Sequence, residues 1–326
     1  LHRLIRRQRQ MCIRDRKGPV YEKDDPYGDN QTNEDLTAVK HVQEMQIIES
    51  KDYEKIKEAV FKYGGVQTSI YNALRSSQSS SPYYNKSTDA YCYIGTEKPN
   101  HDVVIVGWDD SYSKDNFNTD LEGDGAFICQ NSWGDNFGEN GFFYISYYDT
   151  NIGTHNVVYT DIENTDNYDH IYQSDLCGWV GQLGYNKDSI YGANVFTAEG
   201  NENLKAASFY ATGKDSQYEL YVVRQFEDET SLEKMIPVAS GKLGNAGYYT
   251  VDFNQGIEVD AGERYAVVLY IITPGSVHPM AIEYAADEAT ENVDLDDGES
   301  YISANGSKWV SVDTCLLYTS PSPRDV

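Results

Sequence analysis

The segment FICQNSWGDNFG, residues 127–138, constrains the fold of this chain more than any other. An apolar run typical of a buried strand ends at Asn131, and the sequence Ser-Trp-Gly begins the turn that follows. Thirty residues earlier, the segment NHDVVIVGW places His101 at the start of another apolar strand. Neighbouring strands would bring the imidazole and the amide together at one edge of a sheet. An amide that orients a histidine is half of a catalytic arrangement.

Length and composition predict about two folded domains and exclude several classes of partner. The 326 residues are 40% hydrophobic and 13% aromatic, which suffices for packed cores. The formal net charge of −26 argues against nucleic acid, whose phosphates require clustered lysine and arginine, and against anionic lipid. No apolar run reaches the roughly 18–20 residues of a membrane-spanning helix. Five cysteines in a chain of this length do not form a disulfide scaffold.

Both ends of the chain differ abruptly in composition from the rest. Residues 1–16, LHRLIRRQRQMCIRDR, carry six arginines on an otherwise acidic protein and contain no apolar core of a signal peptide. The last twelve residues, 315–326, read CLLYTSPSPRDV and follow a plausible ending at SKWVSVDT. We expect both segments to be non-native tails, so that Cys12 and Cys315 are not native either. The alternative for the first segment is a functional basic arm.

The first half, predicted as a domain over residues 17–163, combines one helix with several strands. SKDYEKIKEAVFKYGG has the helical spacing of apolar residues, with Ser50 as the expected N-cap and Gly64–Gly65 as the end. Strands are expected at VQTSIY, VVIVGW, AFICQ, FFYISYY and NVVYTDI. This pattern predicts an α+β domain in which the strands dominate.

The second half, predicted as a domain over residues 164–314, begins after the polar segment ENTDNYDH. Short apolar or alternating runs such as ANVFTA, QYELYVV and RYAVVLYII are separated by Gly, Asn and Asp, and no amphipathic helix interrupts them. Many short strands with frequent turns predict an all-β antiparallel sandwich. Asn305-Gly306, between strand residues, predicts a hairpin.

The two blocks around His101 and Asn131 carry a specific resemblance. NHDVVIVGW and NSWGDNFGENGFFYIS resemble the histidine and asparagine blocks of papain-like C1 peptidases, over roughly residues 18–162. The resemblance implies the β-rich half of a papain-like fold, with His101 as catalytic base, Asn131 as its orienting partner and Trp133 as a shield. It implies hydrolysis of peptide or protein substrates through a Cys-His-Asn mechanism, without a cofactor or a metal.

Departures from that family are equally informative. The family nucleophile lies in a Gln…Cys-Gly-Ser-Cys-Trp block, about 130–150 residues before the histidine and asparagine, and this chain has no such block. We therefore expect a fragment without its nucleophile, inactive by itself. Cys92 and Cys129 remain alternatives, either as nucleophiles or as small buried residues. Asp102 follows His101 where the best-known members carry a small residue, which leaves the neighbouring subsite undefined.

The second half resembles the lectin-like sandwich that follows the peptidase in some secreted or surface proteins of anaerobic bacteria, through YDHIYQSDLCGWVGQLGY and AVVLYIITPGSVHPMAIEY. The resemblance implies a secreted or cell-surface location. It leaves a glycan or cell-wall ligand as an open alternative, because a lectin-like fold does not by itself establish sugar binding. An alternative function is a catalytically dead carbohydrate- or cell-surface-binding module.

Aromatic residues that could stack on sugars, or pack the core, are Trp179, Tyr185 and Trp309. Acidic runs that could bind Ca²⁺, or form solvated loops, are 109–110, 120–124 and 294–297. Isolated histidines without metal-ligand spacing are His41, His155, His170 and His278.

Overall fold

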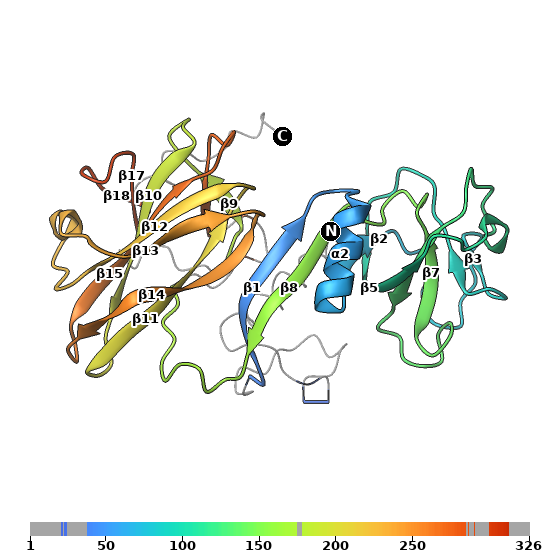
Figure 1. Cartoon of the computed structure of the whole chain (residues 1–326), viewed down its shortest axis with the longest axis horizontal. Coiled ribbons are helices and arrows are strands. Elements are labelled where there is room, and N and C mark those ends of the chain that lie inside the picture. Colours follow the sequence, from blue (N-terminus) through green and yellow to red (C-terminus); the bar gives the residue numbers. More distant parts are fainter. Residues whose placement is uncertain are drawn as a thin grey trace. The chain divides into compact units, whose positions relative to one another are not determined.

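The computed structural model describes residues 21, 23–24, 38–174, 178–284, 286, 290 and 300–312 (Figure 1). The described chain divides into two compact units, one containing Met45–Thr160 and the other the described residues before Met45 and from Asp161 onward. Strands β1 (His41–Ile48) and β8 (Asn156–Glu163) each contain one point of division. The predicted tails at 1–16 and 315–326, the acidic run 294–297 and Cys177 lie outside the described residues.

The first unit is built on a mainly antiparallel sheet. Its strands, in spatial order, are β3 (Tyr84–Asn85), β4 (Ala90–Tyr91), β7 (Phe142–Ser146), β6 (Ala126–Gln130), β5 (His101–Asp109), β2 (Val66–Ile70) and β8. Strands β4 and β7 pair in parallel, whereas β7–β6, β6–β5, β5–β2 and β2–β8 pair antiparallel. The five strands predicted from the first half are all present. A short 3-10 helix (Lys114–Asn116) lies in the loop between β5 and β6.

Helix α2 (Tyr53–Tyr63) forms where the apolar spacing predicted it, but its first turn differs from the prediction. The N-cap is Asp52, whose side chain accepts the backbone N–H of Lys55 at 3.1 Å, so the prediction of Ser50 was wrong. Because Lys51 has a positive φ, the chain turns at Lys51, one residue after Ser50, and the helix begins after that turn. The helix ends as predicted at Gly64, which has a left-handed φ of 92° and donates its N–H to the carbonyl of Val60.

One hydrophobic core fixes the sheet of the first unit. Helix α2 contributes the buried residues Ile56, Ala59 and Val60. Alternate residues of the central strands, such as Ile105 on β5 and Phe127 on β6, lie in the same core and are fully buried. Because the strand period is two, this packing fixes the register of β5 against β6, on which the geometry at the ends of both strands depends.

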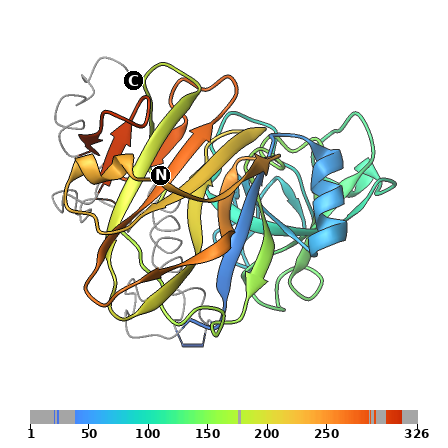
Figure 2. The ribbon, with the colours of Figure 1, turned by 60° about the vertical axis from the view of Figure 1, so that its left-hand side comes forward.

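The second unit has two sheets that share a core, as expected for a sandwich (Figures 1 and 2). One sheet contains β14 (Gly247–Val259), β11 (Glu202–Ala211), β16 (Met280–Ile282) and β9 (Gly181–Leu183). The other contains β13 (Ile236–Leu243), β12 (Ser216–Val223), β15 (Arg264–Ile272), β10 (Ser189–Thr197), β17 (Ser300–Ser303) and β18 (Val310–Ser311). The predicted Asn-Gly hairpin joins β17 to β18 through a wider loop that includes Gly306 at a φ of 74°.

The turn from β14 to β15 is held by a charge pair in the second unit. Both oxygens of Glu263 accept hydrogen bonds from the guanidinium of Arg224, at 2.9 and 2.7 Å. The backbone N–H groups of Gln225 and Asp260 donate to the same carboxylate. The Glu263 side chain is only 6% exposed. Bonding to Arg224 above all lowers the pKa of Glu263 to about 2.

We expect this pair to give the second unit a specific sensitivity to acid. Because the folded pKa is depressed, the stabilisation is complete above the unfolded pKa of about 4.3 and is lost as the pH falls toward about 2. Glu263→Gln should therefore cost on the order of 2 kcal/mol at pH 7 and much less at pH 2.5, measured by urea unfolding. The exposed Glu233 provides the matched Glu→Gln control. An equal loss at both pH values would contradict the assignment.

Candidate active site around His101 and Asn131

The pairing of β5 with β6 brings together the two residues that the sequence singled out. Val104 lies opposite Gln130, so the first residue of β5 and the residue after β6 meet at one edge of the sheet. Nε2 of His101 lies 2.8 Å from Oδ1 of Asn131. His101 is half-buried and Asn131 is buried, so the bond is partly protected from competing water.

The contacts of Asn131 define which ring nitrogen of His101 carries a hydrogen. Oδ1 of Asn131 also accepts the backbone N–H of Ser132 at 2.8 Å, so this atom acts as an acceptor toward both neighbours. Nε2 of His101 is therefore the donor, and Nδ1 is the nitrogen that can exchange a proton with another group. The backbone of Asn131 is also tied down, because its N–H donates to the carbonyl of Gly141 at 2.9 Å.

Trp133 lies beside the histidine, where the shield was predicted. The ring centroids of His101 and Trp133 are 5.3 Å apart, with the planes at 38°. Trp133 in turn contacts Phe137 edge-on at 5.2 Å, and Phe137 is 1% exposed between Tyr84 and Phe143. The buried Phe137 ring therefore supports the Trp133 indole. Sequence reasoning did not select Phe137, because no local signal distinguishes it from an aromatic residue that only fills the core.

The glycine-rich turn after Trp133 needs glycine for backbone reasons. Gly138 has a φ of 57°, and an added Cβ would lie 2.1 Å from the carbonyl oxygen of Phe142. Gly141 has a φ of 91° and accepts the Asn131 N–H described above. These glycines let the turn bring the Gly141 carbonyl close enough to Asn131 to hold its backbone before β7 begins.

Asp102 is directed toward β2 and not toward the histidine ring. Its Oδ1 accepts the hydroxyl of Ser69 at 2.7 Å, and its Oδ2 accepts the side-chain amide of Gln67 at 3.1 Å. Since adjacent strand residues point to opposite faces, Asp102 and His101 are separated by the sheet. The group bonded to Nε2 of His101 is therefore the neutral amide of Asn131.

Cys92 and Cys129, which the sequence left open as nucleophiles, are both fully buried. Burial, with a smaller effect of Asp149, raises the pKa of Cys92 to about 12 and that of Cys129 well above its usual value. Thiolate is the nucleophilic form, so neither environment activates sulfur for attack. Among the described residues these are the free cysteines.

The other residues singled out in the sequence have separate surroundings. Trp309 packs near Tyr191, and its buried indole N–H has no partner within the described structure. Trp179 lies 6.2 Å from the Tyr210 ring, and Tyr185 is 37% exposed. His170 contacts Glu202 and His41 contacts Asn167. His155 and His278 lie on the exposed surface.

The acidic runs within the described residues mainly bond to their own loops. Asp109 accepts from Ser111, Asp110 binds Lys57 and Tyr147, and Asp124 accepts the Lys114 N–H. No group of three His, Cys, Asp or Glu residues that could hold a metal ion is found in the described part of the chain. Likewise, none of its helices is long and apolar enough to cross a membrane.

Comparison with known proteins finds a family match for each half of the chain. Residues 7–162 match the papain family of cysteine proteases, and residues 171–320 match the lectin-like domain family. A cysteine-to-alanine variant of the clostridial cysteine protease Cwp84, after propeptide cleavage, is 29% identical with a TM-score of 0.78, over 93% of this chain and 76% of that one. No curated protein matches the chain.

A second solved structure contains the cysteine protease and lectin-like domains of Cwp84, a surface-layer-associated protein of Clostridium difficile. It is 27% identical with a TM-score of 0.75, over 95% of this chain and 69% of that one. These likenesses confirm the predicted fold, a papain-like domain followed by an all-β lectin-like domain.

Proposed function

We propose that this protein hydrolyses peptide bonds by a Cys-His-Asn mechanism, because its first half matches the papain family of cysteine proteases and its second half matches the lectin-like domain family. In this proposal His101 is the catalytic base, Asn131 orients it and Trp133 shields their bond. The observation that carries the proposal is the 2.8 Å contact between His101 Nε2 and Asn131 Oδ1. No cofactor takes part in this chemistry.

The roles follow from the hydrogen-bond pattern. With Nε2–H held by Asn131, Nδ1 of His101 takes the proton of a cysteine thiol, and the thiolate attacks the substrate carbonyl carbon. The imidazolium then gives its proton to the leaving amine as the C–N bond breaks, which leaves an acyl-enzyme thioester. His101 next removes a proton from water as the water oxygen attacks the thioester carbonyl carbon. The C–S bond breaks, the acid is released, and the cysteine leaves as the thiolate beside the imidazolium. A neutral Asn131 orients the ring without adding a charge to the thiolate–imidazolium pair.

We further propose that the nucleophile comes from sequence outside the described residues, and that these residues alone do not cleave peptides. Cys92 and Cys129 are buried with raised pKa values, which supports a structural role for both. By analogy with the surface-layer-associated relative, the protein would act at the cell surface on a peptide or protein substrate. The lectin-like unit would hold a ligand independently of hydrolysis.

A labelling experiment tests where the nucleophile lies. A peptidyl epoxide that alkylates activated cysteines should leave Cys92 and Cys129 unmodified in the folded chain, as followed by intact mass and peptide mapping. Both thiols should react with a small alkylating reagent after unfolding, which is the internal control. A stoichiometric epoxide adduct on either residue that disappears in His101→Ala would contradict the proposal.

A further inference from the structure

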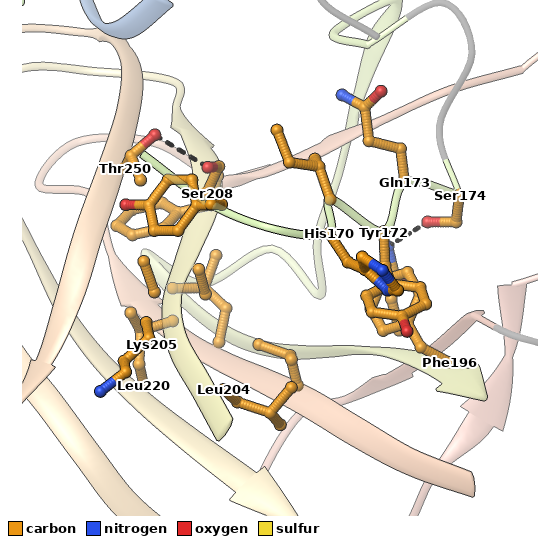
Figure 3. Close-up of a pocket in the computed structure, with 18 of the residues that line it drawn as sticks. His170, Tyr172, Gln173, Ser174, Phe196, Leu204, Lys205, Ser208, Leu220 and Thr250 are labelled. Carbon is orange, nitrogen blue, oxygen red and sulfur yellow. Dashed lines mark hydrogen bonds between the residues drawn. The ribbon is translucent and has the colours of Figure 1, made fainter. Parts of the chain in front are cut away.

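A large cavity lies in the second unit, and its described lining residues include neither His101 nor Asn131. Its volume is about 870 Å³, within the range of ligand pockets, whereas close-packed interiors rarely leave voids larger than a water molecule. It is lined from both sheets, by β11, β14 and β16 on one side and by β10, β12, β15 and β17 on the other. Residues 166–174 cross one end of it (Figure 3).

The floor of the cavity is the apolar core of the sandwich. Phe209, Phe253, Leu269 and Met280 are core residues that line the cavity and are 8–9% exposed. Leu220 and Ile302 also line the cavity and belong to the same core. The opening therefore reaches apolar side chains that a filled sandwich would seal, and such surfaces favour hydrocarbon over water.

The mouth of the cavity is polar, and its polar groups bond largely to one another. Glu202 accepts from the hydroxyl of Tyr172 at 2.8 Å and contacts Nδ1 of His170 at 2.8 Å. Asn194 donates to the hydroxyl of Ser174 at 2.7 Å. Figure 3 shows His170, Tyr172, Gln173 and Ser174 together on one side, across from Lys205, Ser208 and Thr250.

Charge at the lining restricts the class of ligand. Among the described residues, the charged members of the lining are the carboxylates Asp166, Asp169, Glu202 and Glu283 and the lysine Lys205. This excess of carboxylates disfavours an anionic head group. A soluble sugar does not suit the floor either, because its hydroxyl groups would lose their water against Leu, Phe and Met without gaining partners.

We propose that the cavity binds the hydrocarbon chain of an uncharged amphiphile. The chain lies between the two sheets, against Phe209, Leu269 and Met280, and a hydroxyl-bearing head group lies at the mouth near His170 and Glu202. This binding site is independent of the proposed peptidase, because its lining residues all belong to the second unit. Whether or not this site binds an amphiphile, the proposed role of His101 is unaffected.

The full chain can be tested directly with a neutral apolar fluorophore, 1-N-phenylnaphthylamine, and three competitors. We expect saturable binding of the fluorophore and its displacement by 1-monooleoylglycerol below its aggregation concentration. Oleate should compete at least about tenfold more weakly because of its charge, and N-acetylglucosamine tetramer should not compete. Absence of saturable binding, or displacement by the tetramer but not by monooleoylglycerol, would overturn the proposal.

Filling the cavity provides an independent test. Ala207 on β11 and Val267 on β15 both line the cavity and are half-buried. Ala207→Phe and Val267→Phe should each weaken fluorophore binding at least about tenfold, since either ring occupies the space of the ligand. Ala304→Phe, at an exposed position outside the lining, should leave binding unchanged. If one filling variant does not fold, the other provides the test. Unaltered binding by a folded filling variant would contradict the proposal.

Discussion

Replacing His101 by alanine is expected to lower kcat/KM for peptide cleavage by about 10³–10⁴-fold, in a protein that carries the proposed cysteine nucleophile. Without the imidazole, the cysteine loses the base that generates its thiolate, and the leaving amine loses its proton donor. Asn131→Ala should have a smaller effect, on the order of 10–10²-fold, because the ring remains but is no longer held through Nε2. Hydrolysis of a fluorogenic peptide under reducing conditions measures both.

A matched control separates this role from general damage to the domain. His155 is exposed, precedes β8 and has no described contact with His101, so His155→Ala should leave kcat/KM unchanged. The thermal unfolding of all three variants should stay close to that of the parent. Undiminished cleavage by folded His101→Ala would remove the histidine from the mechanism, and with it the proposed role of Asn131.

The His101–Asn131 pair was predictable because it depends on strand ends. An apolar run fixes which residues enter the core, and an antiparallel neighbour then places the end of one strand beside the start of the other. The sequence NSWG followed by a glycine-rich turn supplied the rest of the signal. What the sequence did not indicate was Phe137, because nothing local distinguishes an aromatic residue that supports Trp133 from one that only fills the core.

Other misses have physical reasons of the same kind. Strands β1 (HVQEMQII) and β13 (IPVASGKL) mix polar and apolar residues. The neighbouring strand β8 of β1 lies far away in sequence, and β13 is separated from its partner β12 by a loop that contains a 3-10 helix. The N-cap was misplaced because the positive φ of Lys51 cannot be inferred from its type. The cavity was not foreseen either, since its lining residues resemble any sandwich core and only their incomplete packing sets them apart.

Phe137→Ala is the substitution expected to disturb both the core and the site. Phe137 is 1% exposed and contacts the rings of Tyr84, Trp133 and Phe143 at 5.2–5.6 Å. Removing the ring should destabilise the first unit by about 3–5 kcal/mol through lost contacts and the cavity left behind. Hydrogen–deuterium exchange of the β6 and β7 amides is the appropriate measurement, because it reports on the opening of these strands specifically.

The same substitution should be visible at the histidine before the unit unfolds. Without the Phe137 ring, Trp133 loses a packing partner, and the indole no longer keeps one orientation beside the His101–Asn131 hydrogen bond. The NMR signal of the His101 Nε2 proton should therefore broaden through faster exchange with water. Phe61→Ala is the matched control, because Phe61 is 88% exposed on α2 and its loss should change stability by less than about 0.5 kcal/mol. If Phe137→Ala destabilises the unit but leaves the proton signal sharp, Phe137 supports only the core, and Trp133 shields the pair without it.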